Sequence, residues 1–131
     1  MDPLYISQSY KMTEEPRYSS VFGFDIFPSI PNIRKIFEHY SLAVKHHLKD
    51  LAEPDLAVLY GNYKQVHIGN NTSDQPWFYE FVALSKWNAW TECKDKPTEY
   101  AMFDYCVKAD RLLIAQLGVE ESKHILQNMA V

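Results

Sequence analysis

Two short stretches of the sequence decide the fold, Tyr60-Gly-Asn-Tyr-Lys-Gln65 and Ser85-Lys-Trp-Asn-Ala-Trp90. Because an α-helix repeats about every 3.6 residues, the two tyrosines and the lysine of the first stretch share one helical face. The second stretch places another lysine beside two tryptophans. This combination suits a nucleotide that carries a phosphate, since the base stacks on a flat ring and the phosphate pairs with ammonium groups. The structural alternative is the edge of a hydrophobic core over which a lysine side chain extends.

The first stretch falls in the second of four predicted helices. Pro54 suits the first turn of that helix and Gly69 suits its end. Ahead of it, apolar residues recur at steps of three and four from Ile33 to Leu51, so an amphipathic helix is expected to end before Pro54. Residues 70–76 are almost all turn formers and predict a polar loop.

The second stretch falls in a third helix, expected over residues 80–94, and a fourth helix is expected from about Pro97 to Gly118. Large aromatic residues three positions apart on a helix usually face a core, so both tryptophans are expected to pack inward. The apolar positions of the third helix are Phe81, Leu84, Trp87 and Trp90. The inward face of the fourth helix is expected to comprise Ala101, Tyr105, Ala109 and Leu112.

These patterns predict an all-α protein with three parts. Residues 1–32 contain four of the seven prolines, which forbids long helices there and predicts an irregular arm. Residues 33–118 form the four-helix domain. Residues 119–131 form a C-terminal tail with room for one further short helix. No strand pattern competes with this interpretation.

Composition narrows the class of protein. A chain of 131 residues with 47% hydrophobic residues is long enough for one small domain with a buried core. Its net charge of -4 argues against general nucleic-acid binding, which needs a basic surface. No run of apolar residues is long enough to span a bilayer, so the chain is expected to be soluble or peripheral. Cys93 and Cys106 are expected to be buried reduced thiols rather than a disulfide.

The first 32 residues lack the basic start and apolar run of a secretory signal and the arginine-rich composition of a transit peptide. A cytoplasmic location is therefore expected, with a mitochondrial location, as part of an assembly, as the alternative.

Enzyme chemistry has no support in the sequence. GxSxG, HExxH and Walker A motifs are absent, so no catalytic residue and no cofactor is expected. His39, His46 and His47 lie close together in the first predicted helix, yet a zinc site needs more ligands in tetrahedral geometry. No metal site is expected.

The stretch from Pro54 to Leu112 resembles the acyl-CoA-binding protein family. The resemblance rests on YxxYKQ at residues 60–65, a following glycine at Gly69, a proline at Pro76, and KWxAW at residues 86–90, in that order. It extends back to Phe37 and covers roughly residues 33–118. It implies a four-helix bundle in an up-down-down-up arrangement with a bowl formed mainly by the second and third helices.

The resemblance also implies a function and a set of ligand residues. The ligand would be a long-chain fatty acyl-CoA ester, bound without catalysis by a carrier or sensor. Tyr60 and Tyr63 would pack on the adenine and the ligand's edge. Lys64 and Lys86 would hold the ribose 3'-phosphate, to which the Tyr105 hydroxyl would donate. By position, the full set is Tyr60, Tyr63, Lys64, Lys86 and Tyr105, with Lys45 of the first helix as an addition.

A second hypothesis is an accessory subunit of a larger assembly. The fourth helix is apolar on a second face, which consists of Tyr100, Phe103, Val107 and Ile114. The arm is rich in aromatic residues, which disordered tails lack, and is expected to dock on a partner protein or on this domain. In addition, Trp77, Val82 and Leu84 stand around the third helix where members of the resembled family commonly place lysine or other polar residues.

Overall fold

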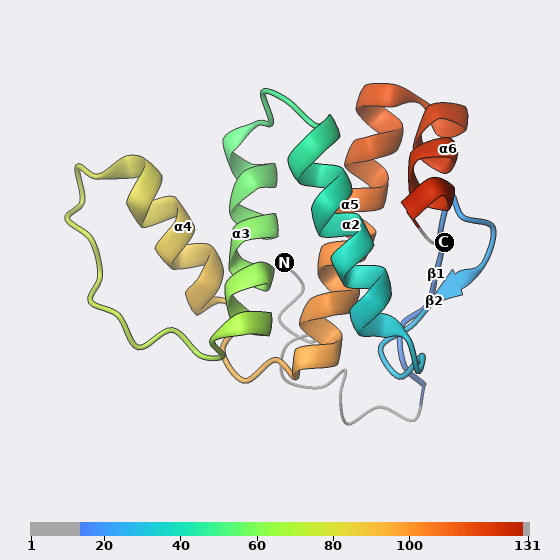
Figure 1. Cartoon of the computed structure of the whole chain (residues 1–131). Helices are drawn as coiled ribbons and strands as arrows, with labels where there is room; N and C mark the ends of the chain where they lie inside the picture. The colour runs from blue at the N-terminus through green and yellow to red at the C-terminus, as the bar shows by residue number, and fades with distance from the viewer. Residues whose placement is uncertain (1–13, 130–131) are drawn as a thin grey trace.

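The computed structural model describes residues 14–129, which form five helices and one pair of short strands (Figure 1). The strands are β1 (Tyr18–Ser19) and β2 (Asp25–Ile26). The helices are α2 (Ile33–His47), α3 (Glu53–His67), α4 (Phe81–Thr91), α5 (Thr98–Leu117) and α6 (Val119–Met129). No helix in this part of the chain is both long and apolar enough to cross a membrane.

The helices form a layered bundle in which α3 is central between α4 and the pair α2 and α5 (Figure 1). Along the chain α2 rises in the view of Figure 1, α3 and α4 descend, and α5 rises again, while α6 packs against α5 and α2 at the other side of the molecule. The all-α, up-down-down-up prediction is confirmed. The strand pair is an addition that the sequence did not predict.

Two helices are shorter than the apolar patterns predicted. The segment after α2 turns at Asp50, whose φ is 52°. It is held there by Gln116 of α5, which donates to the Lys49 carbonyl at 2.6 Å and accepts from the Lys49 N–H at 3.2 Å. After α4 the chain turns at Asp95, whose φ is 65°, so the helix ends at Thr91 and not near residue 94.

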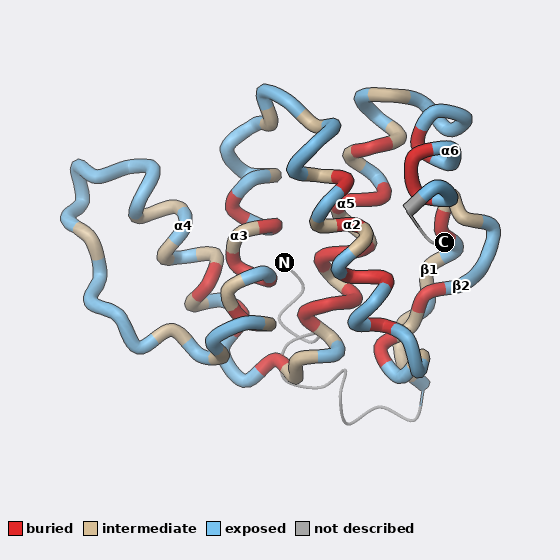
Figure 2. The backbone as a smooth tube through the Cα atoms, in the orientation of Figure 1, coloured by how far each residue is buried: buried red, intermediate tan, exposed pale blue. Residues whose placement is uncertain are grey.

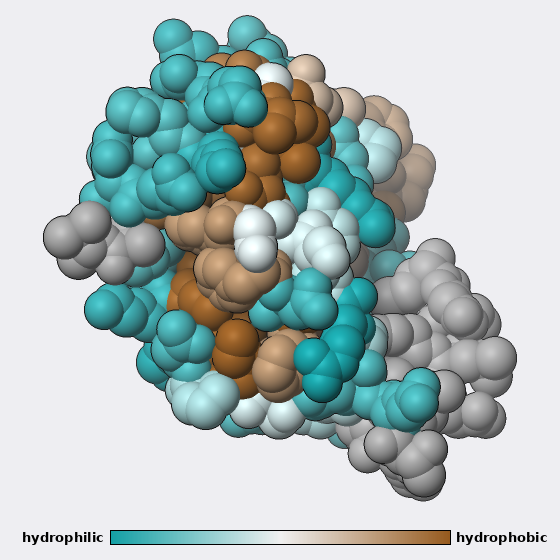
Figure 3. Space-filling view, turned by 90° about the vertical axis from the view of Figure 1, so that its right-hand side faces the viewer, coloured by the Kyte–Doolittle hydropathy of each residue, from teal (hydrophilic) through white to brown (hydrophobic). Residues whose placement is uncertain are grey.

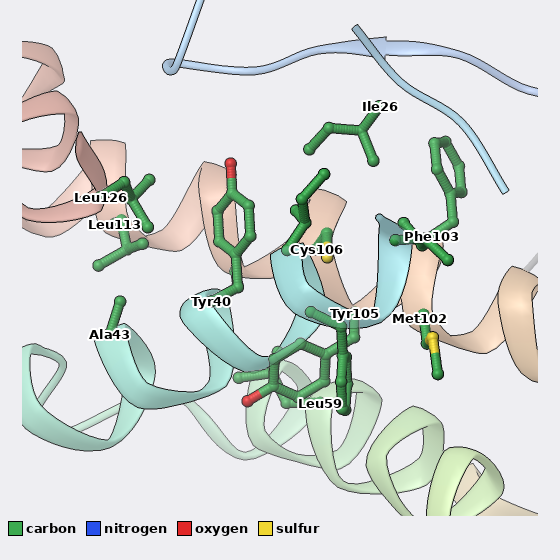
Figure 4. Close-up of a cluster of buried hydrophobic side chains, with 14 of the residues drawn as sticks. Ile26, Tyr40, Ala43, Leu59, Met102, Phe103, Tyr105, Cys106, Leu113 and Leu126 are labelled. Carbon is green, nitrogen blue, oxygen red and sulfur yellow. The ribbon is translucent and has the colours of Figure 1, made fainter. Parts of the chain in front are cut away.

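The core lies between α2 and α5, with contributions from α3, α6 and the arm (Figure 2). Figure 4 shows Tyr40 and Ala43 of α2 facing Cys106 and Leu113 of α5, and all four are fully buried. The two cysteines are buried free thiols. Helix α4 contributes least, because Trp90 is its one buried residue. Phe81, one of the apolar positions predicted for this helix, is 75% exposed, because it lies at the start of a helix that packs chiefly on α3.

The described part of the arm packs on this chain's own helices. Its strands pair antiparallel, with Tyr18 opposite Ile26. Ile26 and Pro28 are fully buried, and Ile26 lies in the same cluster as Phe103 of α5 (Figure 4). Phe103, counted from sequence among the exposed second face of this helix, is only 5% exposed. That expectation is corrected, because arm side chains cover this part of α5.

The other members of that second face, Tyr100, Val107 and Ile114, are half-buried. The side of the molecule that carries the arm and α6 shows a strip of apolar side chains between hydrophilic regions (Figure 3). The first 13 residues of the predicted arm lie outside the described residues.

A buried carboxylate fastens the arm to the bundle. Asp110 of α5 is fully buried and accepts hydrogen bonds from the hydroxyls of Tyr18 in the arm and Tyr40 in α2, both at 2.7 Å. The backbone N–H of Val21 donates to it at 3.3 Å. The Arg111 guanidinium lies 5.2 Å from the centre of the Tyr18 ring. One carboxylate thus joins three segments that are far apart in the sequence.

Replacement of Asp110 tests this junction. We expect Asp110→Ala to lower the free energy of unfolding by about 2–4 kcal/mol, because it leaves two tyrosine hydroxyls and one N–H without their acceptor. Asp25→Ala is the matched control, since among residues 14–129 this exposed carboxylate accepts one side-chain hydrogen bond, from the Ser19 hydroxyl, and its effect should stay below about 0.5 kcal/mol. Urea unfolding measures both. Equal effects of the two changes would contradict a role for Asp110 in fastening the arm.

The same junction predicts a loss of stability at alkaline pH. Burial and the neighbouring Asp110 raise the pKa of Tyr18 from 10.0 to about 12, and burial raises the pKa of Tyr40 as well. Above pH 10 the unfolded chain therefore loses tyrosine protons that the folded chain retains, so stability falls as pH rises from 10 towards 12. Below pH 10 these groups contribute no pH dependence. Tyr18→Phe should flatten the alkaline slope measured by urea unfolding, and an unchanged slope would argue against this cause.

Candidate functional site

The candidate site is built on a close contact between α3 and α4. Gly61 of α3 is buried against the backbone of α4, and a Cβ atom at this position would lie 2.6 Å from the carbonyl oxygen of Ala89. Only a glycine fits at this distance. The contact fixes the position of Tyr60 and Lys64, on α3, relative to Lys86 and Trp90, on α4.

The two lysines of the site converge on aromatic rings. The Lys64 Nζ lies 4.8 Å from the Trp90 ring centre and 5.8 Å from the Tyr60 ring centre. The Lys86 Nζ, from α4, lies 5.3 Å from the same Tyr60 ring. Each distance is within the range of a cation–π contact. Two helices therefore place two ammonium groups beside one tyrosine.

Neither of these ammonium groups is paired with a carboxylate in the part of the chain that the structure describes. The ion pairs found among residues 14–129 are Lys96 with Asp104 and Lys108 with Asp55, which leaves Lys64 and Lys86 without a carboxylate at salt-bridge distance. Lys86 is exposed and Lys64 is half-buried. The site is locally positive although the chain carries a net charge of -4, and it is suited to an anion.

A hollow lies beside these lysines, between α3, α4 and the segment that joins them. Its volume is about 480 Å³. Tyr60, Lys86 and Trp87 line it together with Pro76 and Val82. A hollow with an aromatic wall, a cation and an apolar edge fits an amphipathic ligand.

Both tryptophans of α4 donate hydrogen bonds to the loop that precedes this helix. The indole N–H of Trp90 donates to the Gly69 carbonyl at 2.7 Å, and that of Trp87 donates to the Ser73 carbonyl at 3.1 Å. Asn71 donates to the Thr91 hydroxyl at 3.1 Å. The two indoles thereby hold the polar loop against α4 and shape the hollow. Trp90 is buried, as predicted, whereas Trp87 is half-buried.

A second aromatic group lies one turn along α3. The Tyr63 ring is 42% exposed, and its centre lies 4.3 Å from His67, 6.0 Å from Phe37 and 6.2 Å from Tyr105. Tyr105 is buried against Phe37, with ring centres 5.0 Å apart. Burial raises the pKa of Tyr105 well above its ordinary value, so its hydroxyl keeps its proton. It remains a hydrogen-bond donor.

The structure gathers five of the six residues that the sequence nominated into two neighbouring groups. Tyr60, Lys64 and Lys86 form the first, and Tyr63 and Tyr105 form the second. The exposed Lys45, in the last turn of α2, makes no ring contact or ion pair with either group among the described residues.

The sequence did not predict the roles of two residues in its own motifs. Trp90 acts as a cation partner as well as a core residue, and Gln65 of the YxxYKQ stretch is structural. The Gln65 amide donates to the Asn70 side chain at 3.0 Å and to the Lys96 carbonyl at 3.1 Å. Lys96 itself is buried, with its Nζ 2.9 Å from Asn62. Spacing alone does not separate such supporting polar residues from ligand residues.

Comparisons with known proteins agree with the fold. A family model described as "Acyl CoA binding protein" matches residues 34–109. The chain is 34% identical over 84 residues to an acyl-CoA-binding protein of Brassica napus, covering 64% of this chain and 91% of that one. It is 32% identical over 81 residues to acyl-CoA-binding domain-containing protein 6 of Arabidopsis thaliana, covering 62% and 88%. The crystal structure of Oryza sativa acyl-CoA-binding protein 2 superimposes with a TM-score of 0.60 at 31% identity, covering 64% of this chain and 91% of that one.

The helical arrangement defines a small bundle whose lysine and tyrosine side chains converge beside a hollow. The match to the family model, which covers more than half of the chain, identifies it further: the protein belongs to the acyl-CoA-binding protein family. The arm, Asp110 and α6 lie outside the matched residues 34–109.

The contact at Gly61 gives a prediction about stability. We expect Gly61→Ala to lower the free energy of unfolding by about 1–2 kcal/mol, because the strain of overpacking exceeds the gain in helix propensity. Since the added methyl meets the Ala89 backbone, the double change Gly61→Ala/Ala89→Gly should not restore stability. Thermal unfolding measures both variants. A Gly61→Ala protein as stable as the parent would contradict the close packing of α3 on α4.

Proposed function

We propose that this protein binds long-chain fatty acyl-CoA esters as a non-catalytic carrier or sensor. Membership of the acyl-CoA-binding family supports the ligand class. The observation that carries the proposal is the pair of ammonium groups of Lys64 and Lys86, both directed at the Tyr60 ring beside an open hollow.

In this proposal the two lysines hold the ribose 3'-phosphate of CoA. A phosphate gains charge-assisted hydrogen bonds from two ammonium groups that have no competing carboxylate among the described residues. Tyr60 and the exposed Tyr63 ring supply faces for the adenine and the ligand's edge, and the protonated Tyr105 hydroxyl supplies one further donor. Lys45 would act as an outlying cation for the CoA moiety. No bond in the ligand is made or broken.

The accessory-subunit hypothesis keeps less support. It depended on an exposed second face of α5 and on an arm free to reach a partner. Phe103 is buried, and Ile26 and Pro28 of the arm are buried on this chain's own helices. These observations favour ligand binding over a purely structural role.

Calorimetric titration with palmitoyl-CoA tests the proposal. We expect saturable one-to-one binding, weakened about 10- to 100-fold by Lys64→Ala and by Lys86→Ala, because each change removes a hydrogen bond between charged groups. Lys123→Ala, which removes an exposed lysine from α6, is the matched control and should bind as the parent does.

A second ligand separates the 3'-phosphate from the rest of CoA. The palmitoyl ester of dephospho-CoA lacks this phosphate, so it should bind the parent weakly and lose little further affinity in the two lysine variants. If both variants lose as much affinity for palmitoyl-dephospho-CoA as for palmitoyl-CoA, the lysines do not contact the 3'-phosphate. Absence of palmitoyl-CoA binding by the folded parent would reject the proposed function.

A further inference from the structure

The segment that leads into α4 exposes an unusual run of large apolar side chains. We call Trp77, Phe78, Tyr79, Phe81 and Val82 the aromatic wedge; each is between 55% and 78% exposed. Single exposed apolar residues are common on protein surfaces, whereas five within six consecutive positions form a patch that needs a cause. These side chains contribute little to the fold, because Trp90 is the one buried residue of α4.

The polar groups at the base of the wedge are bonded to one another. Glu80 is the single charged residue from Gln75 to Ser85. Its carboxylate accepts the Trp77 N–H at 2.8 Å, and its own N–H donates to the Trp77 carbonyl at 2.9 Å. The turn therefore satisfies both the N–H and the carbonyl of Trp77. It also holds the Glu80 carboxylate against the Trp77 backbone. The Trp77 backbone therefore keeps its hydrogen bonds when its side chain leaves water.

The composition of the wedge suits the boundary between water and lipid. Tryptophan and tyrosine combine a large apolar ring with one polar group and are enriched where membranes meet water. The rings of Trp77 and Tyr79 are nearly parallel, 8° apart, and Phe78 stands across Tyr79 at 85°. The flat pair and the crossed ring form a compact apolar tip.

The wedge also borders the candidate ligand site. Val82 belongs to the wedge and lines the hollow of about 480 Å³ that Tyr60 and Lys86 also line. Beyond the wedge, the nearest cation along the helix is Lys86, which has no carboxylate partner among the described residues. Asp74 lines the same hollow as one opposing charge. The wedge is apolar, and the ammonium groups of Lys64 and Lys86 beside it have no carboxylate partner among the described residues. This arrangement is complementary to a layer that has an apolar interior and an anionic outer face.

We infer that the aromatic wedge inserts into the interfacial layer of a phospholipid bilayer and turns the mouth of the ligand site towards the membrane surface. The bilayer takes the apolar side chains, and the lysines at the rim meet the anionic groups of its surface. In this position the protein takes up or delivers an acyl-CoA, itself an amphiphile, without moving the acyl chain through water. The cargo rests on the proposed function, whereas the membrane contact rests on the wedge and on the two lysines beside it.

Vesicle flotation of the full chain, with no acyl-CoA present, tests the contact. We expect the chain to float with phosphatidylcholine vesicles and to bind more strongly when phosphatidylserine is included. The triple variant Trp77→Ser/Phe78→Ser/Phe81→Ser should reduce the partition coefficient at least about tenfold, because three large apolar side chains no longer leave water. The emission of the parent should shift to shorter wavelength on binding, and Trp77→Phe should lose most of that shift.

A matched control distinguishes the wedge from general surface hydrophobicity. Leu42→Ser/Ile68→Ser/Val119→Ser removes three apolar side chains that are 45%, 61% and 51% exposed and lie outside the wedge. It should float as the parent does. Lys64→Ala/Lys86→Ala should still float with phosphatidylcholine and should lose only the additional binding to phosphatidylserine.

Ligand binding in solution separates failure of this inference from failure of the proposed function. Hexanoyl-CoA, titrated without vesicles, should bind the wedge variant as it binds the parent. Failure of the parent to float with either type of vesicle would overturn the membrane contact, whether or not hexanoyl-CoA binds. Equal flotation of parent and wedge variant would also overturn it. The contact would also be overturned if the parent self-associates without binding vesicles and the wedge variant does not self-associate. The patch would then be a contact between copies of this chain.

Discussion

The contact between Gly61 of α3 and the Ala89 backbone of α4 is the constraint on which the candidate site depends. Because no side chain separates the two backbones, Tyr60 and Lys64 stand within reach of Trp90, and Lys86 reaches Tyr60 from the other helix. The same crossing opens a hollow between the helices and the loop that the two indoles hold. Residues with supporting contacts and candidate ligand residues thus alternate along one short motif.

A different interaction governs the opposite side of the bundle. Asp110 is buried, and the hydroxyls of Tyr18 and Tyr40 and the N–H of Val21 satisfy its carboxylate. Three donors make burial of a charge tolerable, and their origin in the arm, α2 and the strand turn makes the carboxylate a junction. The arm consequently covers apolar surface of α5, including the face at Phe103.

Apolar surface is therefore buried on one side of this protein and exposed on the other. At α5 the arm buries it, whereas before α4 the aromatic wedge leaves it in water beside the ligand site. Burial at α5 serves stability. Exposure before α4 has no such use, because α4 packs chiefly on α3 and its first turn extends beyond the bundle (Figures 1 and 2). A membrane contact gives the exposed side chains a role that agrees with an amphipathic ligand.

The sequence by itself determined the helical fold and the class of ligand. Periodicity located α3, α5 and the start of α2 closely, because their apolar faces meet a core, and YxxYKQ with KWxAW carried the resemblance to the family. It did not determine which apolar residues are buried: Phe103 was expected on an outer face and is buried, whereas Phe81, an apolar position of its predicted helix, is exposed. Burial depends on what lies opposite a helix face, and only the tertiary structure brings Ile26 to α5 and leaves the start of α4 uncovered. The same holds for Asp110, Gly61 and the indole contacts, whose partners are distant in the chain.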